Sequence, residues 1–123
     1  VNIANETADG LTRDFKVNVG GVMTLVGLVA SDMEKRGSGT ILITGGGFGI
    51  QPNPDYGSLS IGKAALRNLS ASLHQALQPK NIFVGTVTVC GYVKEDAPVH
   101  SPANIAEQFW KLYTDRKDFE IQL

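Results

Sequence analysis

The segment ILITGGGFGI, from Ile41 to Ile50, carries the glycines and the spacing of a phosphate-binding turn. Glycines after an apolar strand let backbone N–H groups approach a pyrophosphate, and Thr-Gly-x-x-x-Gly-Ile is typical of dinucleotide binding. Such a turn must open a helix, because the helix N-terminus supplies free donors and a positive dipole end. Pro52 and Pro54 follow instead, and each biases the residue before it away from helical backbone. We therefore interpret the segment as a tight loop after a strand.

Cysteine and histidine, the other side chains that commonly do chemistry, are few and isolated. Cys90 ends an apolar strand, so a small buried hydrophobe is favoured over a nucleophile. His74 and His100 have no partner at metal-ligand spacing, which favours surface or loop roles and predicts no metal site. A single cysteine cannot form an internal disulfide and fits a reducing compartment, for which the cytoplasm is the default prediction.

Length and charge narrow the classes of function. The 123 residues predict one domain, residues 1–123, which is short for a complete nucleotide-binding enzyme. Eleven basic and twelve acidic residues give no general attraction for nucleic acid or anionic membranes, so neither is predicted as a partner. No apolar run approaches the roughly 20 residues of a membrane-spanning helix. A first residue of Val instead of Met suggests a fragment or a processed product.

Three helices are predicted from hydrophobic periodicity and from end signals. Apolar side chains recur every three or four residues over 12–35 and again over 58–77, as in long amphipathic helices. Ser101 is a good helix cap and Pro102 a good first helical residue, so a third helix is expected from there to about Tyr113.

Strands are predicted between these helices. Continuous apolar runs at 40–44 and 82–89 are typical of parallel strands that are covered on both faces. Apolar and polar residues alternate over 119–123, as in a terminal strand with one buried face, and residues 1–4 could end a short strand. Strands alternating with helices predict an α/β layer with parallel pairing and right-handed crossovers.

Four short blocks, in order along the chain, carry a family resemblance. They are Asn18-Val19-Gly20-Gly21, Gly39-Thr40-Ile41-Leu42-Ile43, Gly62-Lys63-Ala64-Ala65-Leu66 and Cys90-Gly91-Tyr92-Val93. They resemble the Asn-Val-x-Gly helix, the strand before the catalytic loop, the Ser-Lys-Ala-Ala-Leu helix and the Pro-Gly-x-Val turn of short-chain dehydrogenases/reductases. Val1-Asn2-Ile3-Ala4-Asn5 is a weaker match to the family's Asn-Asn-Ala-Gly strand end. The chain is thus similar to the second half of that family's Rossmann-like fold, a parallel sheet with flanking helices.

The resemblance implies an activity and roles for particular residues. Family members transfer hydride between NAD or NADP and a carbonyl or alcohol carbon of a small molecule, and they often form dimers. By resemblance, Lys63 binds the nicotinamide ribose, Asn18 helps to orient Lys63, and Gly91 and Val93 belong to the cofactor site. Residue chemistry alone leaves alternatives open, because Lys63 could equally be a solvated helix lysine and Asn18 a helix cap.

The family's acid/base pair is incomplete in this sequence. Members use Tyr-x-x-x-Lys, in which a lysine one helical turn away lowers the pKa of the phenol, and a serine on the preceding loop. Leu59 stands four residues before Lys63, and Gly46 stands at the serine position. We hypothesise a remodelled acid/base site in which Tyr56 and Ser60 act around Lys63, although Tyr56 lies two helical turns away.

The resemblance also implies a missing partner. The family's first strand, its glycine turn and its selector for the adenine ribose all precede the segments matched here, so the choice between NAD and NADP stays open. An enzyme is predicted only if this N-terminal half is supplied; the alternative is a non-enzymatic dimerisation or regulatory scaffold derived from the fold. We expect an exposed sheet edge that is covered by the complementing half or by another copy in a homo-oligomer.

Two sets of large apolar side chains could belong to the core or to an interface. Phe109, Trp110 and Tyr113 correspond to a substrate lid in the family, but their helical spacing favours packing in the core or an interface. A second set forms the helix stripes, which face either the core or another subunit: Val22, Val26, Leu66 and Leu73.

Overall fold

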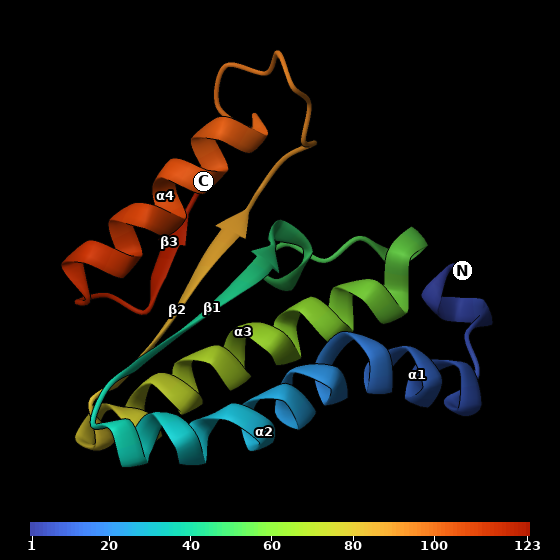
Figure 1. Ribbon diagram of the computed structural model, residues 1–123. Coiled ribbons are helices and arrows are strands. Elements are labelled where there is room, and N and C mark those ends of the chain that lie inside the picture. Colours follow the sequence, from blue (N-terminus) through green and yellow to red (C-terminus); the bar gives the residue numbers. More distant parts are fainter.

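A sheet of three parallel strands with helices on both faces forms the fold in the computed structural model, which describes residues 1–123 (Figure 1). The strands are β1 (Gly39–Gly46), β2 (Ile82–Val89) and β3 (Glu120–Gln122), in the order β1-β2-β3. The helices are α1 (Ala8–Phe15), α2 (Gly21–Arg36), α3 (Gly57–Leu77) and α4 (Pro102–Asp115). This arrangement confirms the predicted α/β class and the parallel sheet flanked by helices.

The parallel register places all carboxyl ends of the strands at one edge of the sheet. Gly39 pairs with Ile82 at the start of β1, and Gly46 pairs with Val89 at its end. Thr88 at the end of β2 pairs with Gln122 at the end of β3. Because ligands of open parallel sheets bind beyond the carboxyl ends of the strands, the residues that follow these ends stand where a ligand would bind.

Helices α1 and α2 form one helical run that a π-helical turn interrupts, instead of the single long helix predicted over 12–35. Thr7 caps α1 by accepting a hydrogen bond from the backbone N–H of Gly10, so the helix begins earlier than the periodicity indicates. A π-helical turn, Lys16–Gly20, joins α1 to α2. Gly37, with φ of 77°, ends α2 in the left-handed conformation that glycine adopts without strain.

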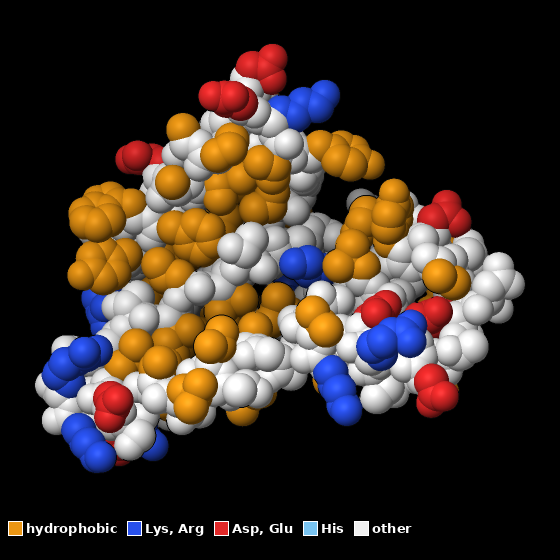
Figure 2. Space-filling view, turned by 45° about the vertical axis from the view of Figure 1, so that its right-hand side comes forward, with side chains coloured by type: hydrophobic (Ala, Val, Ile, Leu, Met, Phe, Trp, Pro, Cys, Tyr) orange, Lys and Arg blue, Asp and Glu red, His pale blue; other side chains and the backbone are white.

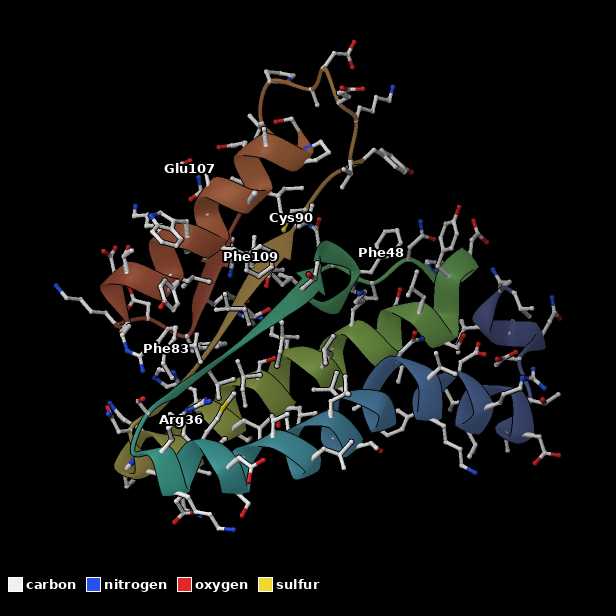
Figure 3. All side chains as sticks on the ribbon, in the orientation of Figure 1. Arg36, Phe48, Phe83, Cys90, Glu107 and Phe109 are labelled. Atoms are coloured by element: carbon white, nitrogen blue, oxygen red, sulfur yellow. The ribbon has the colours of Figure 1, made fainter.

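Two hydrophobic clusters hold the layers together, one on each face of the sheet. The cluster under α2 and α3 contains Val26, Ile43, Leu66, Leu77, Ile82 and Val84. The cluster under α4 contains Phe83, Val87 and Leu112, with Phe109 packed against it. Figure 3 shows Phe83 and Phe109 on β2 and α4. The stripe residues Val26 and Leu66 are therefore core, and Val22 and Leu73 pack against the same core.

Two expectations for the strands were wrong. Residues 1–4 do not end a strand, because Asn2 accepts a hydrogen bond from the N–H of Ala4 and begins a 3-10 turn. Strand β1 is not covered on both faces: Leu42 is 38% exposed and Thr44 is exposed as well. The reason is that α4 packs over β2 and β3, while β1 forms the free edge of the sheet. No helix of the chain combines the length and the apolar character needed to cross a membrane.

Candidate functional site

A cleft of about 570 Å³ opens beyond the carboxyl ends of β1 and β2. Its walls come from the loop after β1, the start of the loop after β2, Lys63 of α3 and Gln122 of β3. Figure 3 shows Phe48 on the first of these loops and Cys90 at the end of β2. Phe48, Ile50, Val89 and Tyr92 make much of the lining apolar, and Lys63 is its only charged residue.

The side chain of Lys63 packs across the end of β1 at Gly46, which has no side chain to obstruct it. A Cβ on Gly46 would lie only 3.2 Å from both Cδ and Cε of Lys63. Lys63 also borders a second hollow of about 400 Å³, which runs along the free edge of β1 between Leu42 and α2. No hydrogen bond or ion pair engages the Lys63 ammonium. The ammonium is therefore available to a ligand in the cleft.

Asn18 lies beside the turn of α3 that carries Lys63. It belongs to the π-helical turn Lys16–Gly20, and a Cβ on Gly62 would come within 3.3 Å of the Asn18 Cβ and 3.4 Å of its Nδ2. Asn18 and Lys63 both line the hollow along the edge of β1. Because Asn18 lies within a continuous helical run, it does not act as a helix cap. Such π-turns occur frequently at functional sites.

The glycines of the loop after β1 serve close packing of the backbone. A Cβ on Gly49 would lie 2.7 Å from the carbonyl carbon and oxygen of Lys63, and 2.9 Å from the nitrogen of Ala64. A Cβ on Gly47 would lie 3.0 Å from the Cα of Cys90. A 3-10 turn, Gly47–Gly49, follows β1, and α3 begins only at Gly57. The interpretation as a tight loop that does not open a helix is confirmed.

Tyr56 and Ser60 are not brought into the cleft. Tyr56 is 50% exposed and stacks on Phe48, with ring centroids 5.4 Å apart. Ser60 is 4% exposed, and its hydroxyl accepts from the N–H of Asn53 at 3.1 Å and donates to the Asn53 carbonyl at 3.2 Å. Ser60 lines a separate, mainly apolar hollow beneath the loop. Of the candidate acid/base residues, only Lys63 lines the cleft.

The turn after β2 contributes Cys90, Gly91 and Tyr92 to the cleft, whereas Val93 is 54% exposed and lies outside its lining. Cys90 is exposed, so its prediction as a buried hydrophobe was wrong: β2 ends at Val89, one residue before it. The ring of His100 lies so close to Gly91 that no Cβ fits there. His100 Nε2 bonds the main-chain oxygen of Leu123 at 2.9 Å, which holds this wall against the end of the sheet.

His74 is half-buried instead of lying on the surface. Its Nδ1 bonds the carbonyl oxygen of Val84 at 2.8 Å, and its ring packs edge-on against Phe83. A nitrogen facing a carbonyl oxygen must carry the proton, so Nδ1–H is the donor. Within the chain, no group of three or more His, Cys, Asp or Glu side chains is placed to hold a metal ion.

An ionic network beside the cleft had no signal in the sequence. Arg67 donates two hydrogen bonds to Glu120, from Nε at 2.7 Å and from Nη2 at 2.9 Å. Thr88 Oγ1 donates to Glu120 at 2.7 Å, and Gln122 Nε2 donates at 2.9 Å. The hydrogen bonds from Arg67, aided by those from Gln122 and Thr88, outweigh desolvation and lower the pKa of Glu120 from 4.5 to about 2. The same pair raises the pKa of Arg67.

Comparison with known proteins gives consistent matches. The family model described as short chain dehydrogenase matches residues 2–105. The chain is 34% identical over 83 residues to dehydrogenase/reductase SDR family member 4 of Sus scrofa, covering 68% of this chain and 30% of that protein. A putative oxidoreductase from Escherichia coli K-12 superposes with a TM-score of 0.87 at 20% identity, covering 100% of this chain and 56% of the other.

A second similar structure contains a bound cofactor. A short-chain dehydrogenase from Sphingobium yanoikuyae, in complex with NADPH, superposes with a TM-score of 0.80 at 20% identity. This match covers 99% of the present chain and 52% of that protein. The chain therefore spans about a third of the length of the curated relative and about half of these two solved structures.

Proposed function

The chain belongs to the short-chain dehydrogenase/reductase family, and on that premise we propose that it forms the nicotinamide-binding half of an NAD(P)-dependent oxidoreductase. The proposed reaction is hydride transfer between the nicotinamide and a carbonyl or alcohol carbon of a small molecule. One observation carries the proposal: Lys63, whose ammonium is unpaired, lines an apolar cleft beyond the carboxyl ends of parallel strands. This is the position at which open parallel α/β sheets bind their ligands.

The residues of the cleft fit the nicotinamide end of the cofactor. The free Lys63 ammonium can donate hydrogen bonds to the ribose hydroxyls, and Asn18 packs behind the same helical turn and positions it. Phe48 and Ile50 offer an apolar wall against which the nicotinamide ring can pack. Gly91 exposes backbone at the opposite wall, with Val93 beyond it. When bound, the cofactor supplies the hydride.

The proton donor in this proposal differs from that of the family, because Leu59 and Gly46 replace the family's tyrosine and serine. Tyr56 and Ser60 remain the proposed substitutes, and use of Ser60 requires its hydrogen bonds to Asn53 to open. The test is turnover by a Tyr56→Phe, Ser60→Ala double variant of the protein supplied with its complementing half. A large loss of kcat supports the two residues, and unchanged turnover removes them from the mechanism.

The unpaired edge of β1 is evidence for a partner that completes the sheet. Leu42 on β1 is 38% exposed, and Leu25 and Leu28 on α2 are 64% and 69% exposed. Figure 2 shows hydrophobic side chains extending from α4 down to α2 on this face. An unpaired strand edge beside exposed apolar side chains is a site for strand addition. We propose that the complementing N-terminal half, or a second copy of the chain, covers it.

This partner proposal is tested by the oligomeric state of the isolated chain. Light scattering during size-exclusion chromatography should show concentration-dependent self-association that a Leu28→Lys, Leu42→Lys double variant reduces. Val1→Lys is the matched control, because Val1 is 77% exposed but lies away from the β1 edge. A stable, monodisperse wild-type monomer would count against a covered edge.

Cofactor binding is tested by a fluorescence titration of NADH and NADPH against the chain. Lys63→Met should weaken binding about ten- to a hundredfold, because a hydrogen bond to a charged group contributes about 1.5–3 kcal/mol. Lys111→Met is the control, since Lys111 is an exposed lysine on α4. Saturable binding that Lys63→Met leaves unchanged would refute the assigned role of Lys63.

A non-enzymatic scaffold is the second candidate function. The observation that favours it is the loss of both hydroxyls, because Leu59 and Gly46 cannot transfer protons. The same titration separates the candidates. Absence of NADH and NADPH binding by the chain, even when joined to a complementing half, would favour the scaffold over the oxidoreductase.

A further inference from the structure

The amide of Gln122, which lines the cleft, is held in one orientation by Glu120. The bidentate pairing with Arg67 keeps the Glu120 carboxylate ionised, so both of its oxygens act only as hydrogen-bond acceptors. One oxygen receives Arg67 Nε and Thr88 Oγ1, and the other receives Arg67 Nη2 and Gln122 Nε2. All four groups that contact the Glu120 carboxylate therefore donate a hydrogen bond to it.

This chemistry fixes which end of the Gln122 amide points at Glu120. If the amide were turned over, its carbonyl oxygen would meet a carboxylate oxygen at about hydrogen-bond distance, and two acceptors repel each other. The nitrogen must therefore face Glu120, and the amide oxygen is turned away from it. The negative charge of Glu120 thus fixes the orientation of the Gln122 amide. No protein donor engages the Gln122 oxygen.

We propose that Gln122 is a ligand-orienting residue of the cleft, whose amide oxygen accepts a hydrogen bond from a hydroxyl or primary amide group of the bound molecule. Arg67 and Glu120 are positioning residues, because they act on the ligand only through the orientation of Gln122. The inference deepens the proposed function and rests on it for the identity of the cleft as a small-molecule site.

The rest of the cleft defines the other properties of the ligand. Lys63 supplies a donor to an acceptor group of the ligand, so the cleft offers a donor from α3 and an acceptor from β3. Phe48 and Tyr92 supply flat apolar surface between the polar groups. The only acidic side chain bonded to a residue of the cleft is Glu120, and its charge is compensated by Arg67. The ligand class is therefore a mainly apolar carbonyl compound that also carries an O–H or N–H donor.

Two small probes that differ in the donor test this inference without the cofactor. Benzamide has a carbonyl acceptor for Lys63 and an NH2 donor for Gln122, whereas N,N-dimethylbenzamide keeps the carbonyl and has no donor. Binding of each to the 123-residue chain is measured from backbone and side-chain amide shifts in 15N-resolved NMR titrations. Benzamide should bind about three- to tenfold more tightly, which is the discrimination that one neutral hydrogen bond supplies.

Gln122→Met keeps the length of the side chain and removes the amide. Gln122 is exposed, so the variant is expected to fold. The ratio of its affinities for benzamide and N,N-dimethylbenzamide is the baseline, because it reflects only the different sizes of the two probes. In Glu120→Gln, where the amide is free to turn over, the ratio should fall below the wild-type value but stay above that baseline, because the ligand can still select the orientation that accepts its hydrogen bond. Gln51→Met is the matched control, because Gln51 also lines the cleft, and it should retain the wild-type ratio.

Each outcome decides the proposal. Loss of the preference in Gln122→Met with retention in Gln51→Met supports it. A wild-type ratio equal to that of Gln122→Met, no binding of either probe, or loss of the preference only in Gln51→Met overturns it. Failure of NADH and NADPH to bind while the benzamide preference persists would refute the proposed oxidoreductase function and leave the role of Gln122 standing.

Discussion

Replacing Glu120 by glutamine should destabilise the fold by an amount that depends on pH. The substitution keeps the shape of the side chain but removes the charge that Arg67 grips with two hydrogen bonds. A pKa of about 2 instead of 4.5 for Glu120 corresponds to roughly 3 kcal/mol of folding free energy, at about 1.36 kcal/mol per pKa unit. The Arg67 side chain is 38% exposed, and solvent screening of the pair reduces the expected loss to about 2 kcal/mol.

The direction of the pH dependence follows from the sign of the pKa shift. Because the folded-state pKa is lowered, the contribution of Glu120 is complete above pH 4.5 and is lost as pH falls toward about 2. In Glu120→Gln this contribution is absent at every pH. The difference in unfolding free energy between wild type and variant should therefore be greatest near pH 7 and narrow steadily below pH 4.5.

Urea denaturation followed by circular dichroism at pH 7, 5, 4 and 3 measures this difference. Glu107→Gln is the control: Glu107 is an exposed acidic residue on α4 without an ion pair, and its loss should change stability by less than about 0.5 kcal/mol. Figure 3 shows Glu107 on α4, away from the cleft. A loss in Glu120→Gln that is below 0.5 kcal/mol, or that is the same at pH 7 and pH 3, would refute the reasoning.

Three further substitutions test the packing that positions the cleft, each by urea denaturation. Gly49→Ala should cost about 2 kcal/mol or more, because the new Cβ would lie 2.7 Å from the backbone of Lys63, whereas Gly27→Ala in open space on α2 should be neutral or stabilising. Val84→Ala should cost about 2 kcal/mol, since this side chain is fully buried. Ser101→Ala should cost about 1 kcal/mol through loss of the α4 cap. A loss below 0.5 kcal/mol in Gly49→Ala, Val84→Ala or Ser101→Ala would contradict the corresponding assignment.

Local sequence signals predicted most of the elements well. The periodicity over 58–77 and the apolar run over 82–89 match α3 and β2 within one residue, because each element buries one continuous apolar pattern. The beginning of α1 was missed, since it depends on the Thr7 cap, whose hydroxyl accepts a hydrogen bond from the N–H of Gly10. The π-helical turn Lys16–Gly20 was missed as well, because the apolar periodicity over 12–35 is that of an ordinary helix.

The sequence predicted only those site residues that belong to a local motif within one element. Lys63 and Gly91 were found from local motifs, and both line the cleft. Gln122 and its orientation by Glu120 were missed, because the contact joins α3, β2 and β3 and depends on the register of the short terminal strand. Cys90 was misplaced for a related reason: composition indicates an apolar strand but does not indicate at which residue its burial ends.

The central claim is that the cleft beyond β1 and β2 binds the nicotinamide end of a cofactor through Lys63. It is tested most directly by a 15N NMR titration with reduced nicotinamide mononucleotide, which lacks the adenosine half and so needs no other part of a dinucleotide site. Saturable shifts centred on Gly46, Lys63 and Gly91, and abolished in Lys63→Met, are the predicted result. No shifts, or shifts centred away from the cleft, would contradict the account.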